Sequence, residues 1–249
     1  MVKKRINRKN ISENKSEDIK NTGKKKSSYL FNIKELLLKP DKFLQIIYSE
    51  NRYQVLIKDF MLIYILYFII SFLAGLVFAR PAITDILLGF ISTVIAALIF
   101  PFVLAGIVHL GVLAFKGKKR FFETYKTAVY TLVIMSVYSI IMVILQLISW
   151  LIWPYDTSIL QQIQTTQDPD LIASLALAFL SQPGAKITIV IYAVMSVISI
   201  IHGFIFYIKG IKKFQEISHG KAALAIILPI VILLVLVVLV ALLVSYLGG

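Results

Sequence analysis

The sequence predicts an all-α fold, a polytopic membrane bundle of five transmembrane helices preceded by short amphipathic helices. Of its 249 residues, 59% are hydrophobic and 16% are charged, and the mean hydropathy is +0.85. Soluble domains carry about 25% charged residues. The apolar residues form uninterrupted blocks, which do not alternate as the strands of a membrane β-barrel do. The chain is therefore expected to cross a membrane as helices.

Five apolar blocks are long enough to cross the hydrocarbon layer, because about 20 residues at 1.5 Å each span roughly 30 Å. The second block is the longest, and Pro101 in its middle predicts a bend. The interiors of the expected spans contain no Asp, Glu, Lys or Arg. Together the spans make a membrane domain of residues 59–249, with spans at 60–79, 86–115, 127–153, 187–208 and 222–247.

The segment before the first span divides into two parts. Residues 1–29 contain ten basic and three acidic residues and few apolar ones, which is typical of a disordered tail. Residues 30–58 alternate apolar and charged side chains, with a break at Pro40, and predict short amphipathic helices on the membrane interface. No removable signal peptide is expected, because the first apolar block begins near residue 60.

Basic residues are distributed unevenly between the two sides of the expected bundle. Residues 1–58 hold 15 of the 26 Lys and Arg, the 116–126 loop holds five and the 209–221 loop holds four, whereas the other side has Arg80 and Lys186 alone. The positive-inside rule then places the N-terminus in the cytoplasm and the C-terminus outside. The net charge of +13 is interpreted as this orientation signal, and no nucleic-acid partner is expected.

Residues 154–186 form the longest segment between spans. Asp168 followed by Pro169 is typical of a helix N-cap and first position, and the apolar run after them predicts a short helix ending before Pro183. This run is too short to cross the bilayer. We expect it to lie on the outer interface or over the bundle, with a re-entrant element as the alternative.

His109 and His202 lie within the expected spans, where ionisable groups are candidates for function. Each precedes the lysine that ends its helix by seven residues, so both imidazoles are expected about 10 Å below the inner boundary. One interpretation is a metal or proton site between the second and fourth spans, and the other is hydrogen-bonded packing. Two histidines are too few for a closed zinc site, so no metal or other cofactor is expected.

The sequence contains no recognisable catalytic motif. It has no cysteine, no H-E-x-x-H, no G-x-S-x-G and no P-loop glycine pattern. No paired carboxylates lie in the expected spans. We therefore expect no enzymatic activity and no catalytic residues.

Three segments resemble Yip1-domain proteins. Residues 37–43 read LLKPDKF, residues 106–124 read GIVHLGVLAFKGKKRFFET, and residues 207–222 read YIKGIKKFQEISHGKA. In this order they are similar to the entry to the first span, the turn between spans two and three, and the turn before span five of that family. The resemblance covers residues 36–245 and implies a non-enzymatic integral membrane protein. Eukaryotic members are associated with Rab GTPases, but the short basic segment of this chain disfavours a small GTPase as its partner.

The sequence therefore predicts a membrane scaffold or adaptor that acts through protein or lipid contacts, in membrane organisation or trafficking. The expected partners are anionic lipid head groups at the cytoplasmic face and a membrane protein or a second copy of the chain. The alternative is a small-solute or ion permease that uses a layer formed by His109 and His202. The candidate contact residues are the basic side chains of the two inner turns: Lys116, Lys118, Lys119, Arg120, Lys209, Lys212, Lys213 and Lys221.

Overall fold

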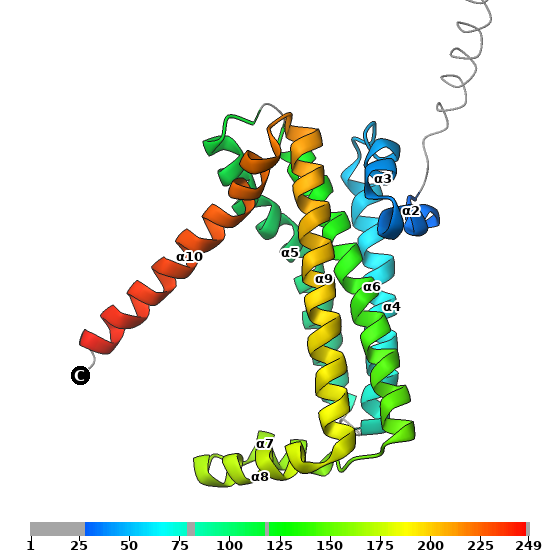
Figure 1. The fold of residues 1–249 in the computed structure, drawn as a ribbon, viewed down its shortest axis with the longest axis vertical. Helices are drawn as coiled ribbons and strands as arrows, with labels where there is room; N and C mark the ends of the chain where they lie inside the picture. The colour runs from blue at the N-terminus through cyan, green and yellow to red at the C-terminus, as the bar shows by residue number, and fades with distance from the viewer. Residues whose placement is uncertain (1–27, 79–82, 118–119, 248–249) are drawn as a thin grey trace, which may run out of the picture.

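The computed structural model describes residues 28–78, 83–117 and 120–247, and within these ranges every regular element is a helix (Figure 1). The all-α prediction is therefore confirmed. The proposed disordered tail falls outside the described residues except for its last two positions.

Five helices in the described residues are long and apolar enough to cross a membrane, as predicted. Each begins or ends some residues beyond its predicted span, because a helix continues past the hydrocarbon layer. Asp59, Glu123 and Lys126 consequently lie inside helices and not in the connecting segments. The five helices are α4 (Tyr53–Phe78), α5 (Ile83–Ala114), α6 (Phe121–Ile152), α9 (Pro183–Gln215) and α10 (His219–Leu247).

Helix α6 lies at the centre of the bundle and packs against α4, α5 and α9. Helix α10 contacts α5 and α9 near its start and then diverges from the bundle (Figure 1). Two close approaches depend on glycine. A side chain at Gly210 of α9 would meet the side chain of Thr127 in α6, and one at Gly111 of α5 would meet the backbone carbonyl of Ala225 in α10. Small residues therefore set these helix separations.

Short helices cover one end of the bundle, which we call the α3 end. They are η1 (Leu30–Asn32), α2 (Ile33–Leu38) and α3 (Pro40–Ile46). Phe43 is fully buried, and its ring packs edge-on against Tyr130 at a centroid distance of 4.9 Å. The apolar face that was expected to rest on lipid therefore packs largely on the bundle, while Phe31 and Leu38 remain exposed.

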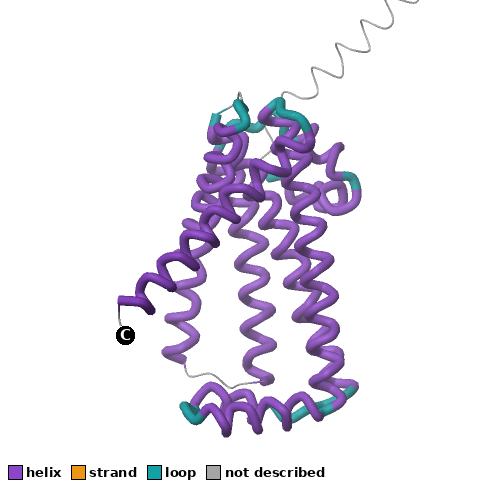
Figure 2. Tube along the Cα trace, turned by 60° about the vertical axis from the view of Figure 1, so that its left-hand side comes forward, coloured by secondary structure: helices purple, strands orange, loops and turns teal. Residues whose placement is uncertain are grey.

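The opposite end, which we call the α8 end, carries α7 (Ser158–Thr165) and α8 (Pro169–Ser181). Asp168 caps α8, because its carboxylate accepts hydrogen bonds from the backbone N–H groups of Asp170 and Leu171. Both helices lie across the end of the bundle and do not insert between the five long helices (Figure 2), so the structure gives no support to the re-entrant alternative. Their interfacial position stays a prediction. Helix α7 was not predicted.

Candidate functional site

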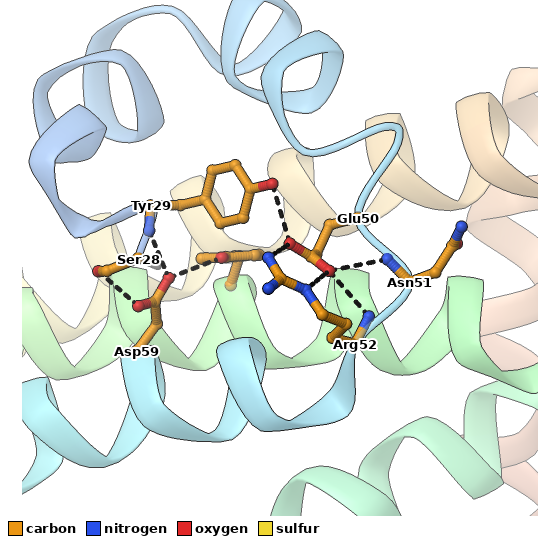
Figure 3. Close-up of polar contacts among 7 residues, drawn as sticks. Ser28, Tyr29, Glu50, Asn51, Arg52 and Asp59 are labelled. Atoms are coloured by element: carbon orange, nitrogen blue, oxygen red, sulfur yellow. Dashed lines mark hydrogen bonds and ion pairs between the residues drawn. The ribbon is translucent and has the colours of Figure 1, made fainter. Parts of the chain in front are cut away.

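A network of buried polar side chains lies at the α3 end, where α4 begins (Figure 3). Asp59, in the second turn of α4, is fully buried. Its carboxylate accepts hydrogen bonds from the backbone N–H of Tyr29 at 2.9 Å, from Oη of Tyr130 at 2.9 Å and from Oγ of Ser28 at 2.6 Å. A buried carboxylate needs such donors in place of water. Asp59 thereby fixes residues 28 and 29 against α4 and α6.

Glu50, in the loop before α4, is the second acceptor of this network. It accepts hydrogen bonds from Nε and Nη2 of Arg52 at 2.9 and 2.8 Å and from Oη of Tyr29 at 3.0 Å. The hydrogen bonds from the Arg52 side chain hold the pKa of Glu50 at about 2. Burial, and then the bond to Glu50, raise the pKa of Tyr29 to about 12. At neutral pH an anionic Glu50 therefore accepts from a protonated Tyr29.

Lys126 forms a second buried contact at the α3 end. Its Nζ donates to the backbone carbonyl of Tyr48 at 3.2 Å, pairs with Glu123 at 3.0 Å and lies over the rings of Phe122 and Phe214. The predicted basic loop 116–126 includes Lys126. That placement is wrong, because α6 begins at Phe121 and directs Lys126 into the core, where it is fully buried.

The described candidate cations lie at the α3 end (Figure 1). Lys116 and Arg120 lie in the turn from α5 to α6, as predicted. The predicted loop 209–221 is wrong for the other four, because α9 continues to Gln215 and α10 begins at His219, so that these cations lie in helices: Lys209, Lys212, Lys213 and Lys221. Lys209 forms an ion pair with Asp41 of α3 at 2.7 Å, which joins α3 to α9. Lys213 is half-buried. Lys118 and Lys119 lie outside the described residues. The exposed candidates are Lys116, Arg120, Lys212 and Lys221. That these side chains bind lipids or proteins stays a prediction.

The two histidines do not form one layer. Nδ1 of His109 lies 3.0 Å from Oγ1 of Thr124, and Nδ1 of His202 lies 3.0 Å from Oη of Tyr138. Both partners belong to α6, and at 1.5 Å per residue they are separated by about 20 Å of rise. His109 and His202 each precede a lysine by seven residues, yet they lie at different depths in the bundle. The reason is that α9 continues as helix beyond Lys209, whereas α5 ends before Lys116. Each histidine instead joins its own helix to α6.

The arrangement at the α3 end is suited to holding segments together. Glu50 and Asp59 accept bonds from several protein donors, and the described residues contain no group of three or more His, Cys, Asp or Glu that could hold a metal ion. Sequence reasoning missed this network, because it interpreted Asp59 as the boundary of the first span. The sequence of residues 124–131, TYKTAVYT, did indicate a helix here, because Thr124, Thr127 and Thr131 recur at the spacing of one helix face. All eight residues are buried.

A comparison with protein families matches residues 34–242 to the model described as Yip1 domain. The match extends from α2 to the far part of α10 and includes all five membrane-length helices. No curated protein and no solved structure matches the chain.

Proposed function

The chain belongs to the Yip1-domain family, and on that premise we propose that it is a membrane scaffold that acts through protein and lipid contacts at its α3 end, without catalysis. It is an integral multi-pass membrane protein, because the described residues include five helices of membrane-spanning length. We assign the α3 end to the cytoplasmic face, since 24 of the 26 basic residues belong to the segments on that side.

The observation that carries this proposal is the locked α3 end. Asp59 and Lys126 hold the segment before α4 against α6, and the Lys209–Asp41 pair joins it to α9. The segment held in this way packs the α3 end together, and Lys116 and Arg120 of the α5–α6 turn and Lys212 of α9 are exposed at this end. Preorganised surfaces bind with a smaller entropic cost than mobile ones.

The permease alternative has less support. It required one layer containing His109 and His202, and these side chains bind to well-separated positions on α6. A small GTPase is not proposed as the partner, because the exposed candidates at the α3 end are basic and not the acidic or aromatic surface expected for such docking.

The proposal is tested by the size of the native complex. In cells that express the chain, Lys116, Lys212 and Lys221 are changed together to Glu, with Lys186→Glu at the α8 end as the control. We expect gently solubilised wild type and control to migrate as the same larger assembly, and the triple variant to migrate as a smaller one. Equal migration of all three proteins, together with histidine-dependent ion flux in liposomes, would support the permease.

A further inference from the structure

A pocket of about 550 Å³ opens at the α3 end between the beginnings of α4 and α6. Aromatic rings form part of its wall. Tyr53 lies edge-on to Phe122 at a centroid distance of 4.5 Å and stacks on Phe102 of α5 at 6.1 Å. The lining residues are Asn51, Tyr53, Arg120, Phe121, Phe122 and Glu123.

The charge of this pocket is positive. Glu123 already pairs with Nζ of Lys126 at 3.0 Å, which compensates its carboxylate. Arg120 is exposed, and its guanidinium has no ion pair within the described part of the chain. Its planar, always-charged group suits bidentate binding of a phosphate.

A second cavity of about 380 Å³ lies deeper in the bundle, between α4, α5 and α6. On α4 its lining begins at Phe60 and reaches Tyr67, about 10 to 20 Å below Tyr53 at 1.5 Å per residue. Tyr53, Phe60 and Tyr67 are seven residues apart and so lie on one face of α4. The wall is mainly apolar, with Ala96, Ala97 and Phe100 of α5 and Leu132 and Met135 of α6.

A cationic pocket at the α3 end, with an apolar cavity further along the same face of α4, matches an amphiphile with a phosphate at one end. Resting on the proposed membrane function, we propose that the groove between α4, α5 and α6 binds one anionic glycerophospholipid. Arg120 binds its phosphate, the rings of Tyr53 and Phe122 enclose the glycerol region, and one acyl chain occupies the cavity beside Ala96. The surrounding bilayer supplies the ligand.

Two variants address the two ends of the site. Arg120→Gln removes the cation, and Lys186→Gln, at an exposed position of the α8 end, is its control. Ala96→Phe fills the cavity from an exposed position, and Ala241→Phe, exposed on the diverging part of α10, is its control. Affinities for phosphatidylglycerol, phosphatidylcholine and water-soluble glycerol phosphate are measured on purified full-length protein in detergent by native mass spectrometry.

We expect wild type to prefer phosphatidylglycerol over phosphatidylcholine. Arg120→Gln should weaken phosphatidylglycerol binding about tenfold, as the loss of one charge-assisted hydrogen bond predicts. Ala96→Phe should weaken lipid binding and leave glycerol phosphate binding unchanged. Both controls should match wild type.

Equal affinity of Arg120→Gln and Lys186→Gln for phosphatidylglycerol would overturn the proposal, as would equal affinity of Ala96→Phe and Ala241→Phe. If glycerol phosphate bound as tightly as phosphatidylglycerol, the ligand of this site would be a soluble phosphate compound and not a lipid, and the proposal would be overturned. Because this measurement uses purified protein, its result is independent of the native complex that tests the scaffold.

Discussion

At the scale of single residues, two carboxylates organise the α3 end. Asp59 and Glu50 are both buried, and Tyr29 contacts both of them, through its backbone N–H and its hydroxyl respectively. Removing one partner from such a network leaves a buried polar group without a hydrogen bond, which costs more than the bond itself contributes.

The Tyr130–Asp59 bond can be tested by Tyr130→Phe. We expect a loss of stability of about 2 kcal/mol, within the usual range of roughly 1.5–3 kcal/mol for hydrogen bonds to charged groups, read as a lower thermal unfolding midpoint in detergent. Tyr192→Phe is the control, since Tyr192 is 40% exposed on α9. A Tyr130→Phe midpoint equal to that of the control would mean that Asp59 does not depend on this donor.

The low pKa of Glu50 predicts that the stability of the folded protein depends on pH. Its folded pKa of about 2 lies below the ordinary value of 4.5, so its stabilising contribution is present above pH 4.5 and is lost as the pH falls from 4.5 towards 2. Glu50→Gln removes this contribution. We expect the unfolding midpoint of wild type to fall more steeply across this range than that of the variant, and parallel curves would contradict the assignment.

At the scale of helices, packing depends on where small residues let backbones approach. Gly111 and Gly106 belong to the same helix and differ in their surroundings. A side chain at Gly111 would meet the Ala225 carbonyl, whereas no atom lies within 4 Å of one at Gly106. A backbone carbonyl cannot rotate away as a side chain can.

Gly111→Ala is therefore expected to destabilise the protein by about 1–3 kcal/mol, the usual cost of overpacking. Gly106→Ala should be neutral or slightly stabilising, because alanine favours helix over glycine by about 1 kcal/mol. Thermal unfolding in detergent measures both. If the two variants melted alike, α10 would not be packed against α5 at this position.

Features that depend on local sequence were the predictable ones. Long apolar blocks indicated the five helices, and Asp168 with Pro169 indicated the start of α8. The Asp59 network was not predictable, because its donors lie 30 and 71 residues away in sequence and one carboxylate at the end of an apolar block carries no information about them. The equal depth expected for His109 and His202 was wrong for a related reason: the depth of a residue depends on where its helix begins and ends relative to the neighbouring helices.

At the scale of the whole molecule, the two ends of the bundle differ in chemistry. The α3 end carries the buried network and the exposed cations, whereas the α8 end carries the helix cap at Asp168 and is covered by α7 and α8. Such an asymmetric bundle should have a single orientation in the membrane, with the basic end in the cytoplasm.

The threading is tested most directly by single cysteines, because the chain has none of its own. Ser218→Cys places a thiol at an exposed position of the α3 end and Gln167→Cys at an exposed position of the α8 end. With a membrane-impermeant maleimide, we predict that intact cells label Gln167→Cys at once and Ser218→Cys only after permeabilisation. Labelling of Ser218→Cys in intact cells, with Gln167→Cys protected, would contradict the assigned orientation, and labelling of both would contradict the five-span threading.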